Sequence, residues 1–585
     1  MNQGDTLSNV LYIDLNRNRF EVKDRSDLFK KYIGGTGVAT RILLEECPEG
    51  CDPFAPENPV IFAVGALTGL FPLASKTVAM FKSPHTGDLG ESHCGGRSAV
   101  AIRMAGLGAI VIKGKSTIPL YLSIHEHDVF FRNAETLWGM ESAFTAGRII
   151  RENETGAGFR SIMRIGKAGE NLVTYATVMA ETYRHFGRLG LGAVFGSKNL
   201  KAVVVAGKNS VPIPDPKSYK KLYKEIYDTA VGSEVMKKYH DLGTPVNVMT
   251  LEGLGAFPTR NLQKANFSQA EQISGENFAK NFLGRRIACA HCPVACIHIA
   301  ALREPYEEES YFYKTSMISY DYEPIFALGS MLEIGNPESF LKLMDKAEKI
   351  GIDAMSAGVV LAWATEAFEK GIITKKQTIE ELHWGDYHGY IRVLDHIVDQ
   401  PNEFYRDLAK GIRHTARKYG GEDFELTFGK NEMPGYHTGP AAHIGFSIGA
   451  RHSHLDNAGY SVDQKKLMEQ DAPPEKVVDE LVAEEEWRQV LSSIVICFFA
   501  RGIYTPEITA QALSLAGLEI TEEGLKNLGR EIHREKYKFK YREGFTFTNT
   551  HLPERIFETP SPVGRLKEEY IRKAIRHFEK IVNSN

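Results

Sequence analysis

The sequence predicts an α+β fold in which a β-rich N-terminal domain precedes two mainly α-helical domains. Short apolar runs broken by Gly, Pro and Asn fill the first 210 residues, which is typical of strands and turns. Helical apolar spacing begins after the proline-rich segment VPIPDPKS, and a Gly-rich, irregular stretch follows near residue 425. The predicted domains are therefore 1–210, 211–425 and 426–585. A chain of 585 residues with 43% hydrophobic residues can bury several such cores.

The strands expected in the first domain are short runs that alternate or are rich in β-branched residues. No regular helical spacers separate most of these runs, so we expect a largely antiparallel arrangement. In chain order they read VLYIDLNRNRFEV, PVIFAVG, TVAMFKSP, AIVIKG, LYLSIHEHDVFF and LKAVVVAG.

The helices expected after residue 218 show apolar residues at helical spacing. The clearest segments are SYKKLYKEIYDTAVGSEVMKKYH, PESFLKLMDKAEKIG and VVLAWATEAFEKG. The last two end at Gly351 and Gly371, and glycine is the residue preferred where a helix is capped at its C-terminus.

Composition and charge exclude several classes of protein. The formal net charge is −4, and no run of Lys and Arg interleaves with aromatics, so we expect no nucleic-acid partner. The first twenty residues resemble no signal peptide, and no stretch of about 18 apolar residues occurs. We therefore expect a cytoplasmic protein without a membrane partner. In a reducing compartment its seven cysteines should be thiols or metal ligands.

The segment CAHCPVACIH, residues 289–298, has the spacing of a metal site, C-x2-C-x3-C. Thiolates so close together suit an iron–sulfur cluster, whereas a zinc ion closed by His291 or His298 is the main alternative. Unliganded thiols are a third interpretation. A fourth ligand must come from elsewhere in the chain, and the candidates are Cys47, Cys51, Cys94 and Cys497.

The glycine-rich stretches of the first domain do not form a nucleotide-binding motif. Gly190, Gly192 and Gly196 miss the G-x-G-x-x-G spacing and precede a predicted strand instead of following one. The Gly-Lys-Ser of AIVIKGKS lacks the first P-loop glycine and leads into a strand-like run. We expect tight turns here, IGGTG among them, whose backbone N–H groups could bind an anion.

The order and spacing of several segments resemble the aldehyde:ferredoxin oxidoreductase family. These tungsten and molybdenum enzymes hold their metal between two pterin cofactors. The resemblance covers essentially the whole chain and implies a β-rich base under the cofactor followed by two helical domains. It rests on YIGGTGVATRILLEE, LTGLFPLASKTVAMFKSPHTGDLGESHCGGRSAVAIRMAGLGAIVIKGKS, IGKAGENLVTYATVMAE, GRLGLGAVFGSKNLKAVVVAG, CAHCPVACIH, DYEPIFALGS, KIGIDAMSAG and NEMPGYH.

The resemblance implies two sets of cofactor ligands. A 4Fe–4S cluster would be held by Cys289, Cys292, Cys296 and Cys497, which leaves His291 and His298 as loop residues. The pterins, with a magnesium ion bridging their phosphates, would contact Lys76, His93, Gly95, Gly96, Arg188, Glu348 and Asp353.

This chain departs from the family pattern at two single residues and in two motifs, which suggests a divergent branch. The family often has Arg where this chain has Lys76, and Asn where it has His93. Of the two D-x-x-G-L-D/C motifs that grip the pterins, the first reads EKIGID. The second reads SSIVIC and keeps only Cys497 and an aliphatic residue.

The resemblance also implies a reaction, the oxidation of an aldehyde to a carboxylic acid. Glu323 and a histidine, His454 or alternatively His452, would accept and donate protons in the pocket. Without the resemblance, Glu323 would be a capping or surface acid and the histidine a structural one. Residues 436–460 are the expected substrate wall, and the absence of an Arg and Lys cluster there disfavours a phosphorylated substrate.

Electrons would pass through the cluster to ferredoxin or to a small iron–sulfur subunit, in a homodimer or a heterodimer. One alternative is a family member that reduces an aromatic acyl thioester or a carboxylic acid. An alternative of another class is a zinc-stabilised binding protein without enzymatic activity.

Overall fold

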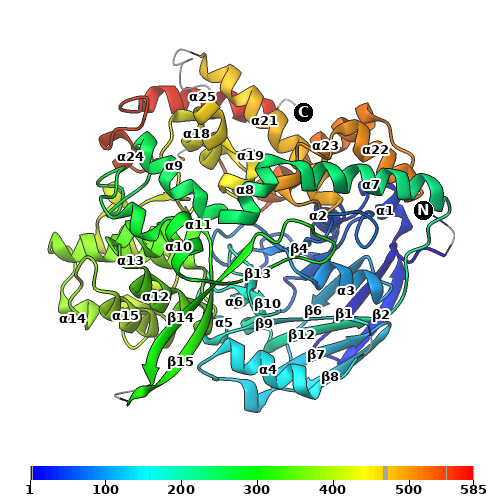
Figure 1. Ribbon diagram of the computed structural model, residues 1–585, viewed down its shortest axis with the longest axis horizontal. Helices are drawn as coiled ribbons and strands as arrows, with labels where there is room; N and C mark the ends of the chain where they lie inside the picture. The colour runs from blue at the N-terminus through cyan, green and yellow to red at the C-terminus, as the bar shows by residue number, and fades with distance from the viewer. Residues whose placement is uncertain are drawn as a thin grey trace.

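The computed structural model has a sheet-rich N-terminal region followed by a helix-rich remainder, which confirms the predicted fold class (Figure 1). It describes residue 2 and residues 4–156, 158–306, 309–465, 472–548 and 550–583, with only the backbone of 309 and 310. Within these ranges no helix is long and apolar enough to cross a membrane.

Two six-stranded sheets form the N-terminal region, and they adjoin where β5 lies beside β11. The first has the order β2 (Arg19–Asp24), β1 (Asn9–Asp14), β6 (Ala109–Lys113), β3 (Val60–Ala63), β4 (Thr77–Lys82), β5 (Leu89–Cys94). The second has the order β11 (Arg184–Phe186), β10 (Val178–Ala180), β9 (Phe159–Ile165), β12 (Leu200–Gly207), β7 (Leu120–His125), β8 (Asp128–Asn133).

The strand pairing is largely antiparallel, as predicted. Within the described residues, β1 with β6 and β7 with β12 are the parallel pairs of these two sheets. The run VLYIDLNRNRFEV forms the expected hairpin, in which Asn9 pairs with Asp24 and Asp14 with Arg19. Every residue of β12 is buried, which explains why its sequence does not alternate between apolar and polar residues. Its one charged residue, Lys201, is buried in an ion pair with Glu170.

The helices of the N-terminal region are α1 (Ser26–Tyr32), α2 (Gly35–Glu46), α3 (Ser98–Met104), α4 (Ala143–Asn153), α5 (Lys167–Glu170) and α6 (Leu191–Ser197). Those of the central region are α7 (Pro216–Gly232), α8 (Glu234–Leu242), α9 (Asn247–Leu254), α10 (Gly275–Asn281), α11 (Tyr322–Leu328), α12 (Pro337–Ile350), α13 (Ala354–Glu369), α14 (Lys375–Thr378), α15 (Tyr387–Asp399), α16 (Glu403–Leu408) and α17 (Ile412–Tyr419). The last group comprises α18 (Pro440–Ile448), α19 (His454–Asn457), α20 (Gly459–Lys465), α21 (Pro474–Ser493), α22 (Pro506–Leu515), α23 (Glu522–Arg542), α24 (Arg555–Glu558) and α25 (Glu568–Asn583).

The predicted central helices are present with the expected ends. The segment after residue 218 forms α7 and α8, and the other two form α12 and α13. Gly351 caps α12 with φ of 74°, a left-handed conformation that favours glycine. Gly371, just beyond α13, has φ of 70°.

The segment IGGTG is not a tight turn, contrary to the prediction, because α2 begins at Gly35. A Cβ atom on Gly35 would lie 2.2 Å from the carbonyl oxygen of Ser492, and one on Gly65 would lie 2.5 Å from that of Ser493. These glycines let the backbone near residue 493 press directly onto the first sheet. We call this contact the glycine seam.

The central region contains a sheet that the sequence pattern did not predict. It has the order β13 (Leu283–Ile287), β14 (Ile297–Tyr306), β15 (Glu309–Tyr320), all antiparallel. The cysteine-rich segment is the loop between β13 and β14, so these strands hold both of its ends. A short hairpin, β16 (Thr427–Phe428) with β17 (Asn431–Glu432), lies near the predicted boundary at residue 425.

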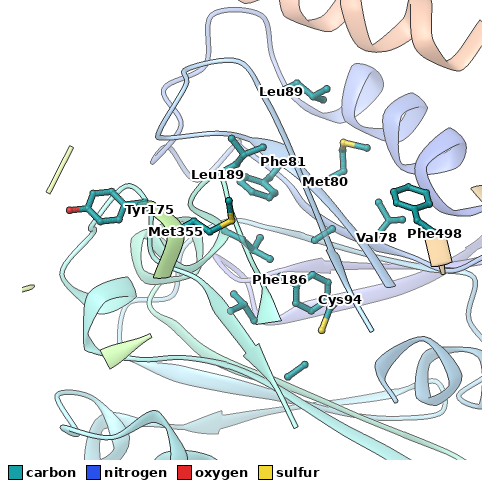
Figure 2. Close-up of a cluster of buried hydrophobic side chains, with 14 of the residues drawn as sticks. Val78, Met80, Phe81, Leu89, Cys94, Tyr175, Phe186, Leu189, Met355 and Phe498 are labelled. Carbon is teal, nitrogen blue, oxygen red and sulfur yellow. The ribbon is translucent and has the colours of Figure 1, made fainter. Parts of the chain in front are cut away.

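The hydrophobic core runs from the sheets into the C-terminal region. Phe62 of β3 packs against Phe186 of β11, with ring centroids 5.3 Å apart, and so joins the two large sheets. Figure 2 shows Val78 of β4, Cys94 of β5 and Phe186 in one buried cluster with Phe498. Because Phe498 directly follows Cys497, this packing fixes the position of the last predicted cluster ligand.

A buried ion pair ties α24 to α13. The Arg555 guanidinium donates to both carboxylate oxygens of Glu366, at 2.6 and 3.2 Å, and the Asn261 amide donates to the same group at 2.7 Å. Without the arginine, Glu366 would keep a single cation, Lys370, whose side chain is half exposed. The pair is therefore expected to contribute strongly to stability.

We expect Arg555→Met to lower the free energy of unfolding by about 3 kcal/mol, because the buried carboxylate of Glu366 loses its main cationic partner. The measurement is the denaturant midpoint of the purified protein. Lys224→Met is the matched control, since it breaks the exposed pair with Asp228 and should cost less than about 0.5 kcal/mol. Equal losses in both variants would contradict the expectation.

Candidate functional site

A cavity of about 400 Å³ brings together residues from all three predicted domains. Most of the site residues predicted from the sequence line it, namely Lys76, His93, Gly95, Arg188, Cys289, Cys292, Cys296, Glu323, Glu348, Asp353, His454 and Cys497. Gly96 and His452 are not part of this lining. Residues more than 400 positions apart in the chain therefore share one site.

The four predicted cluster cysteines are free thiols that line this one cavity. Burial raises the pKa of Cys292 to about 12, and the neighbouring Cys497 and Cys289 raise it further in the same direction. Burial and the same two neighbours also raise the pKa of Cys296 well above its usual value. Such mutual effects require sulfur atoms at short range, although Cys497 is remote in sequence.

Backbone hydrogen bonds hold the cysteine loop against the N-terminal region. The amide of Ala290 donates to the carbonyl of Gly96 at 2.8 Å, and the amide of Leu73 donates to that of His291 at 3.0 Å. The amide of Cys497 in turn donates to the carbonyl of Leu73 at 2.9 Å. The chain around Leu73 therefore links the loop to the fourth cysteine.

Gly95 has a steric reason to be glycine. A Cβ atom there would lie 2.9 Å from the sulfur of Cys289. The neighbouring Gly96 has φ of 112°, which a residue with a side chain rarely adopts, and its missing Cβ leaves room for Arg184 at 3.3 Å. The two glycines therefore leave space for Cys289 of the cysteine loop and for Arg184 beside the cavity.

The two histidines of the loop are placed differently from metal ligands. His298 lies on β14 and its Nε2 is 2.9 Å from the carbonyl of His240, while His291 is exposed at the surface. In the described parts of the chain no three His, Cys, Asp or Glu side chains converge on one metal-ion position.

Arg184 is a site residue that the sequence did not reveal. Burial opposes its charge, but the thiols of Cys289, Cys94 and Cys296 raise its pKa above the ordinary value. Its Nε atom has no hydrogen-bond partner among the described residues. The only signal was its place in YRHFGRLG, four positions before Arg188.

Arg188 is held by the helical region on one side and leaves one nitrogen unused. Its Nε donates to Asp353 at 3.1 Å, and its Nη2 donates to the Glu432 carbonyl at 2.8 Å. Its buried Nη1 has no partner within the described chain. Arg184 and Arg188 therefore offer unused N–H groups at the cavity, which fits an anionic group such as a phosphate.

Glu348 lies in the last turn of α12, and Asp353 directly precedes α13. Asp353 caps α13 by accepting from the amide of Met355 at 3.1 Å, besides its bond to Arg188. Burial raises the pKa of Glu348 to about 8, and its one hydrogen bond among the described residues comes from Ser319. Glu348 is thus protonated near neutral pH and able to donate a hydrogen bond.

Lys76 and His93 are the two predicted cofactor contacts whose residue types depart from the expected pattern. The ammonium of Lys76 lies 4.1 Å from the ring centroid of Phe498, a cation–π contact. Burial lowers the pKa of His93 to about 4, and its Nε2 lies 2.7 Å from Glu91. A neutral imidazole is a hydrogen-bonding group without charge, as an Asn amide is, so this departure preserves the polarity of the position.

Glu323 and His454 meet at the cavity wall, 3.1 Å apart between Oε1 and Nε2. Tyr436 donates to the same oxygen at 3.2 Å. Burial opposes ionisation of Glu323, but the hydrogen bond and the electrostatic interaction with the His454 ring bring its pKa below the usual value. Burial, then the charge of Glu323, raises the pKa of Asp321 to about 8. Asp321 therefore holds a proton at neutral pH while Glu323 is ionised.

His452, the alternative histidine, points elsewhere. Its Nδ1 lies 3.0 Å from the carbonyl of Phe446 and its Nε2 lies 3.1 Å from the ammonium of Lys540. Burial lowers its pKa to about 4. Between the two candidates the geometry favours His454.

The chain matches known proteins along most of its length. The chain matches the family models described as "Aldehyde ferredoxin oxidoreductase, N-terminal domain" over residues 10–207 and "Aldehyde ferredoxin oxidoreductase, domains 2 & 3" over residues 218–584. A structure titled "Active site complex BamBC of Benzoyl Coenzyme A reductase in complex with 1,5 Dienoyl-CoA" shares the fold. Its TM-score is 0.82 at 23% identity, over 99% of this chain and 94% of that chain.

Curated relatives are similar over nearly the full length. The "Tungsten-containing aldehyde ferredoxin oxidoreductase" of Pyrococcus furiosus is 30% identical over 562 residues, which are 93% of this chain and 90% of the relative. That of Thermococcus kodakarensis is 30% identical over 96% of this chain and 93% of the relative. The "Aliphatic sulfonate oxidoreductase, WOR-like subunit" of Pyrococcus furiosus is 30% identical over 90% of this chain and 85% of the relative. The chain belongs to the aldehyde ferredoxin oxidoreductase family of enzymes.

Proposed function

We propose that this enzyme oxidises an aldehyde to a carboxylic acid at a tungsten bis-pterin cofactor and passes the electrons through a 4Fe–4S cluster. The observation that carries the proposal is the ionised Glu323 paired with His454 on the wall of a cavity that also holds four clustered thiols. Family membership supports the cofactor, since the tungsten-containing relatives cover almost the whole chain.

The residues present fit the cofactor. Unused N–H groups of Arg184 and Arg188 would bind its phosphates, with Lys76 as a further cation. His93, protonated Glu348 and the backbone at Gly95 and Gly96 would hydrogen-bond its rings or phosphates, and Asp353 would hold Arg188 in place. A magnesium ion would be a further cation for these phosphates. The bound cofactor supplies a two-electron acceptor.

The conversion of an aldehyde and water to an acid releases two electrons and two protons. The Glu323–His454 pair would accept one of these two protons. Glu323 accepts the Nε2–H of His454, and Nδ1 of His454 has no partner among the described residues, so Nδ1 is free to take a proton from the water. The Glu323 carboxylate then stabilises the imidazolium. Tyr436 fixes the carboxylate by donating to it.

Cys289, Cys292, Cys296 and Cys497 would bind the cluster, which accepts electrons one at a time. His291 in the same loop is exposed, so the cluster lies near the surface at this point. Ferredoxin or a small iron–sulfur subunit could approach there. Whether the enzyme works as a homodimer or with such a subunit is answered by the mass of the complex isolated from its own cells.

Metal analysis tests the cofactors directly. Protein produced with tungstate and iron is expected to contain both metals, with zinc well below the protein concentration. The measurement is inductively coupled plasma mass spectrometry on the purified chain, with molybdenum quantified in the same run. Zinc as the sole metal would contradict both cofactors and favour a binding protein.

An activity assay then decides the direction of the reaction. Oxidation of aldehydes with ferredoxin is compared with reduction of acids or acyl thioesters by a low-potential dye.

A further inference from the structure

Two stacked aromatic pairs line the cavity beside the proposed catalytic residues. Tyr239 of α8 stacks on Phe499, with ring centroids 4.0 Å apart and planes at 15°. Tyr436 stacks on Tyr460 of α20 at 4.2 Å and 20°. All four rings belong to the cavity lining. They come from the central and C-terminal regions, so the wall forms only when these regions are folded together.

The two pairs adjoin each other at the reacting end of the cavity. The hydroxyl of Tyr436 contacts Glu323, and its ring lies 5.2 Å from that of His454. Burial raises the pKa of Tyr239 to about 12, and the Tyr460 hydroxyl and the Glu323 carboxylate raise it in the same direction. The Tyr239 hydroxyl is therefore near both groups. A molecule that presents an aldehyde to Glu323 must therefore place the rest of its body against these rings.

The rings are not ordinary core residues. Tyr436 is buried, but Tyr239, Tyr460 and Phe499 are each only partly buried. Large aromatic surfaces left at a cavity gain free energy when an apolar ligand covers them. Flat rings also favour a flat partner, because offset stacking adds to the burial of area.

The charges around this wall do not favour an anionic tail on the substrate. Arg488 and Arg501 are the cations nearest Tyr460, and both lie close to Glu484, at 2.8 and 3.9 Å. Their charge is thus partly balanced. The four aromatic side chains of the wall carry no charge themselves.

We propose that the Tyr239–Phe499 and Tyr436–Tyr460 pairs form a stacking slot that selects aryl aldehydes over saturated aldehydes of the same size. The inference rests on the proposed function and names its substrate class. Tyr239 and Phe499 are the specificity-determining residues, since they lie on the wall without contacting Glu323 by a hydrogen bond.

The test compares benzaldehyde with cyclohexanecarbaldehyde, which has the same carbon skeleton but a saturated, puckered ring. The holoenzyme is expected to prefer benzaldehyde about tenfold in kcat/KM. In Tyr239→Leu/Phe499→Leu the preference should fall to within about twofold, mainly through a higher KM for benzaldehyde. Tyr239→Phe keeps the ring and should keep the preference, which separates loss of stacking from misfolding.

Tyr227→Leu is the matched control, because Tyr227 stacks on Tyr223 at 6.3 Å on the surface of α7, outside the cavity. It should retain the wild-type preference. A wild-type enzyme that favours the saturated aldehyde, or a double variant with an unchanged ratio, would overturn the slot.

Binding of the product acids separates this inference from the proposed function. Isothermal titration calorimetry of the holoenzyme with benzoate and cyclohexanecarboxylate needs no turnover. Tighter binding of benzoate, lost in the double variant, supports the slot even when no aldehyde is oxidised, and in that case the proposed reaction alone fails. Equal binding of both acids with active aldehyde oxidation overturns the slot and leaves the reaction standing.

Discussion

Glu323→Gln is expected to lower kcat for aldehyde oxidation at least about 100-fold while the iron and tungsten contents stay unchanged. The amide nearly preserves shape and can still bond to Tyr436 and His454, but it cannot carry the charge that stabilises a protonated histidine. Because the pKa of Glu323 lies below its usual value, the wild-type carboxylate is ionised throughout the neutral range. The measurement is steady-state reduction of ferredoxin or viologen dye, with metals quantified in the same preparation.

The partner variant His454→Asn should show a similar loss, since it removes the nitrogen that takes the proton. Glu338→Gln is the matched control, because Glu338 is an exposed acid in the first turn of α12, away from the cavity. Full activity in Glu323→Gln with normal metal content would remove Glu323 from the mechanism. Loss of tungsten would show instead that it acts in holding the cofactor.

Cys497→Ser is expected to lose the 4Fe–4S cluster and, with it, electron transfer to any external acceptor. A serine oxygen is a poor substitute for a thiolate at iron, and the other three cysteines cannot complete the ligand set. The amide of residue 497 still donates to Leu73, so the chain should remain folded at this point. We expect at least about half of the iron to be absent, with the visible absorbance of the cluster and dye reduction falling together.

Cys94→Ser is the control for this variant. Cys94 is also buried and lies near the cluster loop, but its sulfur contacts the Gly95 carbonyl at 3.0 Å. It should keep its iron. Loss of the cluster in Cys94→Ser with retention in Cys497→Ser would mean that the fourth ligand is Cys94.

Local patterns predicted the local parts of this fold well. The hairpin of β1 and β2, the largely apolar β12 and the Gly351 cap of α12 each follow from a few neighbouring residues. The start of α2 did not, because Gly35 is required by the carbonyl of Ser492, and no local pattern records a contact between residues so far apart. The sheet of β13 to β15 was missed inside a region with predominantly helical spacing.

The candidate site was likewise predicted from the sequence only in part. The cysteine spacing and the resemblance placed twelve residues that line one cavity, but the choice between His452 and His454 needed the direction of each ring. Arg184 and Asp321 were overlooked because isolated charged residues in a sequence are usually solvated. Their burial, and the unusual pKa of Asp321 near 8, exist only after the central region closes over the sheets.

The glycine seam has a consequence for how the enzyme is made. Three of the proposed cluster ligands emerge from the ribosome together, whereas the fourth follows 201 residues later, as 497 minus 296. The segment that carries it reaches its position only when Ser492 and Ser493 settle onto Gly35 and Gly65. A chain that stops before residue 497 therefore cannot offer the complete proposed ligand set, so we expect the cluster to form only after this segment has folded. Presence of the cluster would then show that the N-terminal glycines Gly35 and Gly65 are in contact with the segment that carries Cys497.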